Sequence, residues 1–292
     1  MDWLQLAMHL DDHDPAVVEA VFERRGALAV TYADAADDPV LEPAPGETPL
    51  WKHTEIRALF AAGVDVDALR AALGTALHLD EPPPIRVETL ADRAWEREWL
   101  ADFRPMRFGR RLWIVPGGEA APDPEAVSVT LDPGLAFGTG THETTALCLE
   151  WLEAAELRDR TVLDFGCGSG ILGIAALKLG AASVDAVDID LQAVRATRQN
   201  AERNGVLDRL RAGTRLDDSG IRYDVVVANI LAGTLIETAN SICDRLRPGA
   251  MLALSGVLGP QVDDVASAFA GRIEFAPPRL RGDWALLTGT RG

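Results

Sequence analysis

The chain has 292 residues, 48% of them hydrophobic, and carries a formal net charge of -17 at pH 7. Such a chain can bury a full core in one or two globular domains, and it has no low-complexity tract. The negative charge argues against direct nucleic-acid binding, because phosphates are repelled by the average field of the protein.

The first residues lack the basic and apolar regions of a signal peptide, and no apolar run reaches the ~18 residues of a membrane span. We therefore expect no membrane segment. Three widely spaced cysteines, Cys148, Cys167 and Cys243, form neither a disulfide framework nor a zinc motif. A reducing cytoplasm, with no bound metal, is the expected setting.

Residues 1–90 have the pattern of a small ferredoxin-like α+β domain. Asp14 is a predicted N-cap in front of a helix that begins at Pro15, and the second helix, from Asp65, has Val66, Leu69, Leu73 and Leu77 on one face. The predicted order of elements is β-α-β-β-α-β. The strands are expected at 3–10, 27–32, 51–60 and 85–90, and the helices at 15–25 and 65–77.

The same region holds 17 Asp and Glu residues against 6 Lys and Arg residues. This acidity suits a basic protein partner, and the alternative is that it serves solubility or adaptation to salt. Residues 91–110 follow as a linker, whose predicted helix over 91–103 carries Trp95, Trp99 and Phe103 on one side. Such a stripe is typical of packing, with a substrate-binding box as the alternative.

From residue 111 to residue 292, predicted strands and helices alternate, which favours a doubly wound, mainly parallel sheet. The last two strands have no long helix between them and are expected to pair antiparallel. The strands are predicted at 112–115, 127–131, 161–165, 183–188, 210–213, 223–228, 250–255, 273–276 and 284–289, and the helices at 143–155, 171–179, 191–204, 233–246 and 259–269.

A glycine-rich turn follows the apolar strand at 161–165 and contains Gly166, Gly168 and Gly170. Glycines let a ligand approach the backbone at the carboxyl end of a parallel strand. The spacing G-x-G-x-G is shorter than that of dinucleotide sites and is the form that S-adenosylmethionine enzymes prefer. Asp164, just before the turn, could hold the ammonium group of the methionine moiety directly or through water.

Two acidic residues follow the next strand. Asp188 lies 22 residues after Gly166, where a carboxylate can accept hydrogen bonds from both ribose hydroxyls. Asp190 is predicted to cap the helix that begins at Leu191, with ligand binding as the alternative.

The strand at 223–228 runs into Asn229, Ile230, Leu231 and Ala232. Amine methyltransferases place the methyl acceptor at this strand end, where an amide and nearby carbonyl groups accept hydrogen bonds from the incoming nitrogen. Asn229 and Ile230 are therefore candidate catalytic residues. The alternative is that Asn229 only caps the next helix.

A loop over 131–145 is rich in Gly and Thr, and long loops in compact domains are usually functional. Phe137 is expected to help close the pocket and exclude water. His142 is either a general base or a residue that fixes the loop. Its unperturbed pKa of about 6.5 matches poorly with a lysine amine of pKa about 10.4, which favours the second role.

Together, the segments 132–145, 164–172, 187–190 and 229–233 resemble the PrmA family of bacterial ribosomal-protein methyltransferases. The similarity covers nearly the whole chain, including the linker. The motifs F-G-T-G-T-H and N-I-L-A behind a ferredoxin-like domain are specific to that family, whereas the glycine turn is common to the cofactor class. Glu143 and Thr234, which flank these motifs, stand where proline is common in the family.

The resemblance implies a Rossmann-like class I methyltransferase domain over 111–292, with a seven-stranded, mainly parallel sheet. The implied substrate is large-subunit ribosomal protein L-eleven (L11), recognised by residues 1–90 and methylated on lysine side-chain and N-terminal amines. The linker would let the catalytic domain reach several of these amines. The expected binding residues for S-adenosyl-L-methionine are Thr145, Asp164, Gly166, Gly168, Asp188 and Asn229.

Three other functions fit parts of the pattern. Methylation of a glutamine amide or a nucleobase usually goes with a Pro-Pro-aromatic sequence after the polar residue, and Ile230 and Leu231 stand there instead. An NAD-dependent oxidoreductase would need the longer glycine spacing. A non-catalytic ribosome-binding module would not need intact cofactor and acceptor motifs, so a protein-lysine N-methyltransferase is the prediction.

Overall fold

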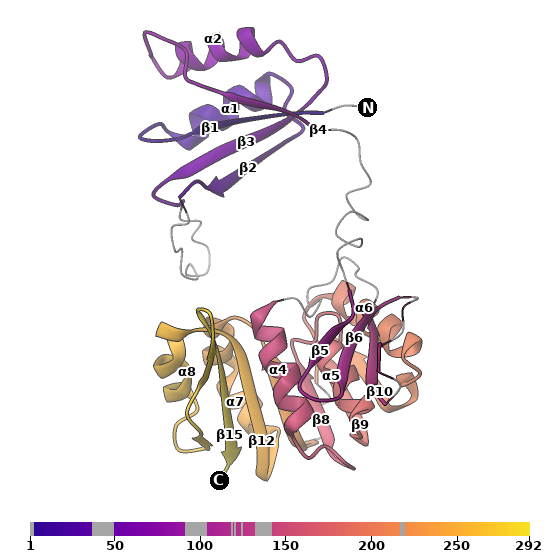
Figure 1. Ribbon diagram of the computed structural model, residues 1–292. Helices are drawn as coiled ribbons and strands as arrows, with labels where there is room; N and C mark the ends of the chain where they lie inside the picture. The colour runs from indigo at the N-terminus through magenta and orange to yellow at the C-terminus, as the bar shows by residue number, and fades with distance from the viewer. Residues whose placement is uncertain are drawn as a thin grey trace. The chain divides into compact units, whose positions relative to one another are not determined.

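The computed structural model describes residues 3–36, 50–90, 104–117, 119, 121–123, 125–131, 142–216 and 220–292. The chain forms two compact units, residues 1–98 and 99–292 (Figure 1). The predicted linker helix with its aromatic stripe and the predicted pocket residue Phe137 lie outside the described residues.

The first unit is a four-stranded antiparallel sheet of order β2-β3-β1-β4, with α1 and α2 against one face (Figure 1). This order and the sequence of elements confirm the predicted ferredoxin-like pattern. The elements are β1 (Trp3–His9), α1 (Pro15–Arg24), β2 (Ala29–Asp34), β3 (Thr54–Ala61), α2 (Val66–Ala76) and β4 (Arg86–Leu90).

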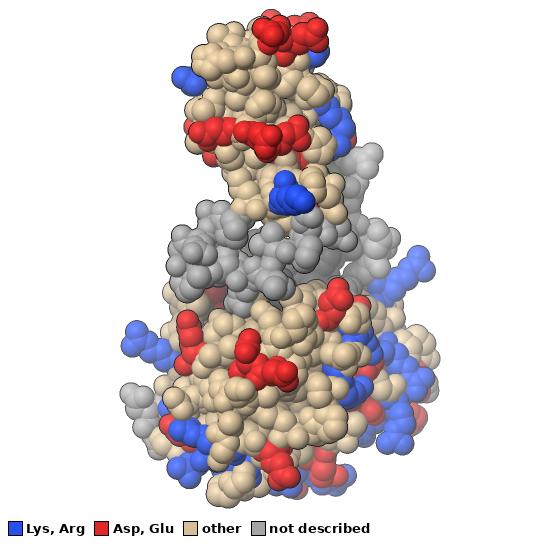
Figure 2. Space-filling view, turned by 90° about the vertical axis from the view of Figure 1, so that its left-hand side faces the viewer, with Lys and Arg blue, Asp and Glu red and all other residues tan. Residues whose placement is uncertain are grey.

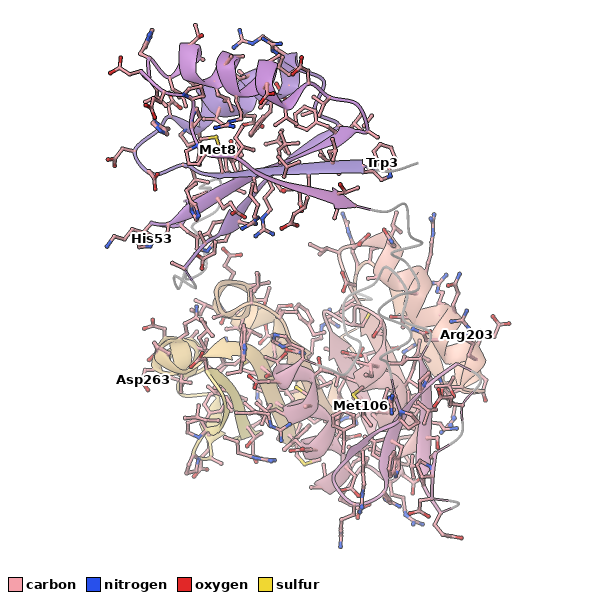
Figure 3. The ribbon with its side chains drawn as sticks, turned by 45° about the horizontal axis from the view of Figure 1, so that its top comes forward. Trp3, Met8, His53, Met106, Arg203 and Asp263 are labelled. Atoms are coloured by element: carbon pink, nitrogen blue, oxygen red, sulfur yellow. The ribbon has the colours of Figure 1, made fainter. Side chains whose placement is uncertain are left out.

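The first helix begins at the predicted cap, Asp14, and the second begins after Asp65, which is its cap and not its first helical residue. Asp14 accepts a hydrogen bond from the amide of Ala16 at 2.9 Å, and Asp65 accepts one from the amide of Ala68 at 2.9 Å. These bonds satisfy amides that the first helical turn leaves without partners. The helices bury their apolar faces against the sheet, where Met8 of β1 lies among the core side chains (Figure 3).

The second unit contains a twisted sheet of order β10-β9-β8-β11-β12-β15-β13, in which β14 pairs only with β15. The strands from β10 to β12 are parallel. At the edge, β13 and β15 pair antiparallel, as predicted, and β15 also pairs antiparallel with β12 and β14. The strands are β8 (Thr161–Phe165), β9 (Ser183–Val187), β10 (Leu210–Gly213), β11 (Tyr223–Asn229), β12 (Leu246–Leu258), β13 (Ile273–Phe275), β14 (Arg279–Arg281) and β15 (Trp284–Arg291).

Helices cover both faces of this sheet, which is why its central strands are apolar throughout. Val162 of β8 packs in the cluster of α4 and α5, whereas the next residue, Leu163, packs in the cluster of α7. The helices are α4 (Glu143–Ala154), α5 (Ile171–Lys178), α6 (Leu191–Arg203), α7 (Ala232–Asp244) and α8 (Val262–Ala268). Among the described residues, no helix is long and apolar enough to cross a bilayer.

Two features of this unit differ from the sequence prediction. The strands predicted at 112–115 and 127–131, observed as β6 (Leu112–Pro116) and β7 (Val127–Leu131), form a separate sheet with β5 (Met106–Phe108). β5 and β14 were not predicted, because three residues are too short to show an alternating pattern.

Charge is distributed unevenly over the described surface. On the face that Figure 2 shows, Asp and Glu side chains form bands on the first unit, and Lys and Arg side chains are sparse there. The second unit carries both signs, often close together. Several of these neighbours are ion pairs between Arg and Asp or Glu side chains, such as that of Arg211 with Asp185.

Asp224, on β11, joins the amino-terminal ends of two central strands. Its carboxylate accepts hydrogen bonds from the amide and the hydroxyl of Thr161 on β8, each at 2.9 Å, and lies 2.6 Å from the guanidinium of Arg247. Although burial alone would raise the pKa of Asp224, the bonds from Arg247 and Thr161 outweigh it and hold this pKa below its usual value. The ionised carboxylate therefore stabilises the fold.

We expect Asp224→Asn to lower the free energy of unfolding by about 1–3 kcal/mol at pH 7, because the variant loses the charge-assisted bonds from the amide and hydroxyl of Thr161 and leaves Arg247 with only its hydrogen bond to the Thr161 hydroxyl. Since the pKa of Asp224 is depressed in the folded state, this contribution is complete above about pH 4 and is lost as the pH falls further. Urea unfolding at pH 7 and at about pH 3 measures the difference. Asp263→Asn, on an exposed position of α8, is the control; equal destabilisation by both variants would contradict the assignment.

Candidate functional site

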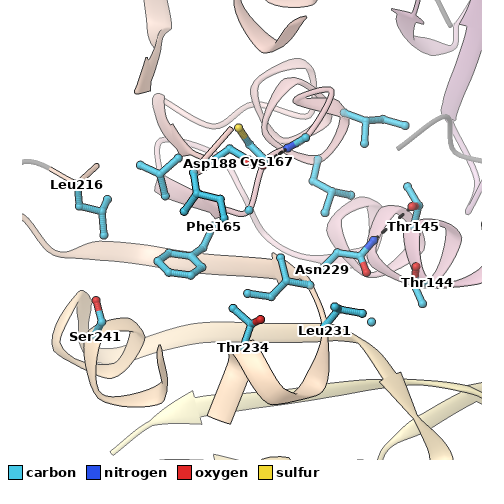
Figure 4. Close-up of a pocket in the computed structure, with 18 of the residues that line it drawn as sticks. Thr144, Thr145, Phe165, Cys167, Asp188, Leu216, Asn229, Leu231, Thr234 and Ser241 are labelled. Atoms are coloured by element: carbon cyan, nitrogen blue, oxygen red, sulfur yellow. Dashed lines mark hydrogen bonds between the residues drawn. The ribbon is translucent and has the colours of Figure 1, made fainter. Parts of the chain in front are cut away.

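A pocket of about 860 Å³ opens at the carboxyl ends of β8, β9 and β11. Parallel strands bring these ends to one edge of the sheet, where open α/β folds bind ligands. Figure 4 shows side chains from these strands and from α4 and α7 facing the cavity. The described residues that line it include the predicted Thr145, Gly166, Gly168, Asp188, Asn229 and Ile230, together with His142, Cys167, Ile189, Leu216, Gly256 and Trp284.

The glycine turn (residues 166–170) forms the floor of this pocket and lies against the end of β9. The amides of Gly166 and Cys167 both donate to the carbonyl of Val187, at 2.8 and 3.0 Å. Gly166 has φ of 77°, and a Cβ on it would collide with the side chain of Ile230. Only glycine tolerates both this positive φ and the close approach of Ile230. Without a side chain, the backbone of residue 166 is exposed to a ligand.

Two buried polar residues of α6 donate hydrogen bonds to carbonyl groups of the turn. Thr197 is fully buried and donates its hydroxyl hydrogen bond to the carbonyl of Gly168 at 3.0 Å. Asn200 is 4% exposed and donates to the carbonyl of Ser169 at 2.9 Å. Buried polar groups are costly unless they are paired, so these side chains fix the positions of the carbonyls that they meet.

Asp188 connects the end of β9 to the turn. Its carboxylate accepts hydrogen bonds from the amide of Gly168 at 2.9 Å and from the amide of Asp190 at 3.0 Å. Each carboxylate oxygen retains a further lone pair, which leaves acceptors for two hydroxyl groups. The next side chain, Ile189, is 96% exposed and lines the pocket, so it offers an apolar surface to a flat ring.

Asp190 has the capping role that the sequence predicted for it. Its side chain accepts a hydrogen bond from the amide of Gln192 at 2.8 Å in the first turn of α6. This cap fixes the start of the helix directly behind Asp188.

Asp164 is fully buried on the face of the sheet that α5 covers, and it is not among the lining residues. One carboxylate oxygen accepts from the amide of Gly173 at 2.8 Å, and the other, Oδ1, accepts no hydrogen bond within the described part of the chain. Burial, together with the smaller effect of the Asp188 charge, raises the pKa of Asp164 to about 7, although the hydrogen bond from Gly173 lowers it. A ligand ammonium group near Asp164 would stabilise the ionised carboxylate, either through a bridging water molecule or by direct electrostatic attraction.

Asn229 and Ile230 line the pocket at the carboxyl end of β11, where the side chain of Ile230 lies against Gly166 of the turn. The Asn229 side-chain amide donates to the hydroxyl of the buried Thr145 at 3.3 Å, drawn as a dashed line in Figure 4. This bond directs the NH₂ group toward α4, and the amide oxygen, which has no hydrogen-bond partner among the described residues, can accept one. The amide of Ile230 donates to the carbonyl of Ser255 at 3.2 Å, which ties the chain after β11 to β12.

His142 is the N-cap of α4. Its Nδ1 accepts from the amide of Thr144 at 3.4 Å and lies 2.7 Å from the Thr144 hydroxyl, so in the neutral ring Nε2 carries the proton. The ring meets Trp284 edge to face, with centroids 4.9 Å apart. These contacts favour the structural role of His142 over that of a general base, because the acceptor nitrogen is engaged.

The sequence analysis did not identify Trp284, Ile189, Thr197 or Asn200 as site residues. Ile189 could have been found from its position after Asp188 at a strand end. Thr197 and Asn200 are polar residues on the buried side of a predicted helix, three apart, which is a signal for a polar contact. No local signal places Trp284 here, since 142 residues separate it from His142.

Comparison with known proteins gives a consistent result. The family model described as "Ribosomal protein L11 methyltransferase (PrmA)" matches residues 2–292. Proteins named ribosomal protein L11 methyltransferase from Shewanella denitrificans and Azotobacter vinelandii are each 50% identical to this chain over 293 residues, covering 100% of both sequences. A crystal structure of ribosomal protein L11 methylase from Lactobacillus delbrueckii subsp. bulgaricus is similar, with 34% identity and a TM-score of 0.60, over 65% of this chain and 99% of that one.

We expect Thr197→Val to weaken binding of S-adenosylhomocysteine about 2- to 10-fold, because the isosteric variant leaves the Gly168 carbonyl without its donor and loosens the turn. Isothermal titration calorimetry measures the change. Thr197→Ser keeps the hydroxyl and is the matched control. If the Val and Ser variants bind equally, Thr197 does not position the turn.

Proposed function

Because the chain belongs to the ribosomal protein L11 methyltransferase family, we propose that it transfers methyl groups from S-adenosylmethionine to lysine side-chain and N-terminal amines of L11. The observation that carries this proposal is the amide of Asn229, oriented by Thr145 at the edge of a pocket whose floor is the glycine turn. Because the chain belongs to this family, we exclude an NAD-dependent oxidoreductase and a non-catalytic ribosome-binding module as its function. For the same reason we exclude methylation of a glutamine amide or a nucleobase.

The residues of the pocket fit S-adenosylmethionine. Asp188 would accept from the ribose hydroxyls, Ile189 would contact the adenine, and the exposed backbone of the glycine turn would lie along the methionine part. The Oδ1 of Asp164, which has no hydrogen-bond partner within the described part of the chain, belongs to the residue two positions before Gly166. When bound, the cofactor supplies an electrophilic methyl group on a positively charged sulfur.

The chain's own contribution is to position the acceptor amine. The Asn229 amide oxygen can accept a hydrogen bond from the amine, and the carbonyl group of Ile230 is the second candidate. Two acceptors fix the direction of the nitrogen lone pair, and such positioning can contribute about 7–11 kcal/mol to lowering a barrier. The side chain of Phe137 would cover the pocket and exclude water.

A lysine amine must be neutral before it can attack. With its Nδ1 engaged by Thr144, His142 is not arranged to take the proton. We infer that the proton leaves to solvent before the amine enters the apolar pocket. Burial itself favours the neutral amine, because desolvation penalises the charged form.

The remaining assignments also belong to this proposal. Residues 1–90 would recognise L11, a basic partner for an acidic domain, and residues 91–110 would act as the linker to a catalytic domain over 111–292. The cytoplasm, where ribosomal proteins are made, is the expected compartment, and three buried free cysteines are consistent with it. Neither membrane attachment nor direct nucleic-acid binding is part of the proposed function.

We expect purified L11 to gain mass in steps of one methyl group when it is incubated with the enzyme and S-adenosylmethionine, with peptides mapping the gains to lysines or the N-terminus. Asn229→Ala should lower kcat about 10- to 100-fold, because the amine loses an orienting acceptor. Mass spectrometry measures both. No methylation of L11 by the wild-type enzyme, despite cofactor binding, would overturn the assigned substrate, and full turnover by Asn229→Ala would overturn the acceptor role.

The raised pKa of Asp164 gives a pH-dependent prediction. Below about pH 7 the carboxyl is mostly protonated, and above it the ionised form attracts the ligand ammonium. The ratio of wild-type to Asp164→Asn affinity for S-adenosylhomocysteine should therefore rise about tenfold between pH 6 and pH 8. Calorimetry at four pH values tests this; a constant ratio would show that Asp164 does not interact with the ammonium.

A further inference from the structure

The hairpin of β14 and β15 brings Trp284 to the pocket from the far end of the chain. Arg281 pairs with Trp284 across a turn at Gly282 and Asp283. β14 has only three residues and pairs with no strand other than β15 among the described elements. On its other side, β15 pairs with β12 as far as Trp284 and Leu258, and the carbonyl of Asp283 accepts a hydrogen bond from the amide of Gly259 at 2.8 Å. Main-chain pairing therefore fixes the β15 side of the turn, whereas β14 depends on side-chain contacts with its other neighbours.

Glu150 of α4 supplies the strongest of these contacts. Its two carboxylate oxygens accept hydrogen bonds from Nη2 of Arg281 at 2.8 and 2.9 Å. Nη2 of Arg279 donates to the same carboxylate at 3.3 Å. Both arginines of β14 are thus joined to one acidic side chain, which is 23% exposed.

A second contact on the same side of α4 meets the turn itself. A Cβ built on Gly282 would lie 2.6 Å from the carboxylate of Glu143, so the turn backbone rests against this side chain. Glu143 and Glu150 are seven residues apart, which is close to two helical turns and places them on one face. The hairpin is therefore held at two points along α4.

The same helix carries the acceptor side of the pocket. Its N-cap, His142, meets Trp284 edge to face, and its first turn contains Thr145, which orients Asn229. The helix, the hairpin and the Asn229 amide thus form one connected group. A shift of the hairpin would move Trp284 relative to the amide that receives the amine.

We propose that Glu150 is a positioning residue of the methyl-acceptor site, which holds Trp284 against His142 through its ion pairs with Arg279 and Arg281. This inference rests on the proposed function, since it assigns the Trp284 side of the pocket to the substrate amine. Ion pairs that are this exposed contribute little to folding. Their effect is on the geometry of the site. Asp188 and the glycine turn lie outside the group, and Thr145 and Asn229, which are also expected to bind the cofactor, are joined by a hydrogen bond of their own that these ion pairs do not include.

The test compares Glu150→Ala, Arg281→Ala, the double variant and the control Glu156→Ala, in which an exposed acidic residue just after α4 is removed. Each single variant should lower kcat/KM for L11 about tenfold while the Kd for S-adenosylhomocysteine changes less than about twofold. The double variant should be no worse than the singles, because both changes break the same contact. A parallel loss of cofactor affinity and activity, additive effects, or unchanged kcat/KM would each overturn the proposal.

A second measurement does not depend on the methyl acceptor. Fluorine NMR of protein labelled with fluorotryptophan resolves the seven Trp residues, and Trp284→Phe identifies the resonance of Trp284. This resonance should shift or broaden in Glu150→Ala and Arg281→Ala and stay unchanged in Glu156→Ala. An unchanged resonance in the first two would overturn the proposal. If the wild-type enzyme does not methylate L11 but the resonance shifts as expected, the proposed substrate fails and the positioning role stands.

Discussion

The pocket depends on the close approach of the glycine turn to the end of β9. Two successive amides of the turn donate to one carbonyl, that of Val187, and a third donates to the carboxylate of Asp188. Side chains at Gly166 and Gly170 would prevent this approach, because their Cβ atoms would collide with Ile230 and Thr197. The main chain is therefore the surface that a ligand meets, and the carboxylate is already oriented by the turn beside it.

The two sides of the pocket are held by different helices. On the cofactor side, α6 begins at the Asp190 cap, just beyond Asp188, and buries Thr197 and Asn200 beneath the turn. On the acceptor side, α4 connects Asn229, through Thr145, to the hairpin that carries Trp284. Different helices therefore hold the Asn229 amide and the glycine turn.

Buried polar groups are concentrated where the site needs fixed geometry. Thr145, Asp164, Thr197 and Asn200 are each at most 4% exposed, and Asp164 alone among them has an oxygen without a donor in the described part of the chain. Burying this carboxylate oxygen away from water without a hydrogen-bond donor costs free energy, and a cationic ligand nearby would lower that cost. Asp224, at the other end of the same strands, is fully paired and stabilises the fold.

The sequence by itself determined the order of nearly all helices and strands, the ferredoxin-like and Rossmann-like patterns, and the positions of Gly166, Asp188 and Asn229 at strand ends. These features follow from local periodicity, capping residues and glycine spacing, which act over a few neighbouring residues. Only the tertiary structure decided that Trp284 meets His142, that Glu150 holds the hairpin, and that β5, β6 and β7 form a sheet of their own. The first two contacts join residues more than a hundred positions apart. The periodicity of β6 and β7 predicts that they are strands but not with which strands they pair, because no local sequence signal specifies which surfaces meet when the chain packs.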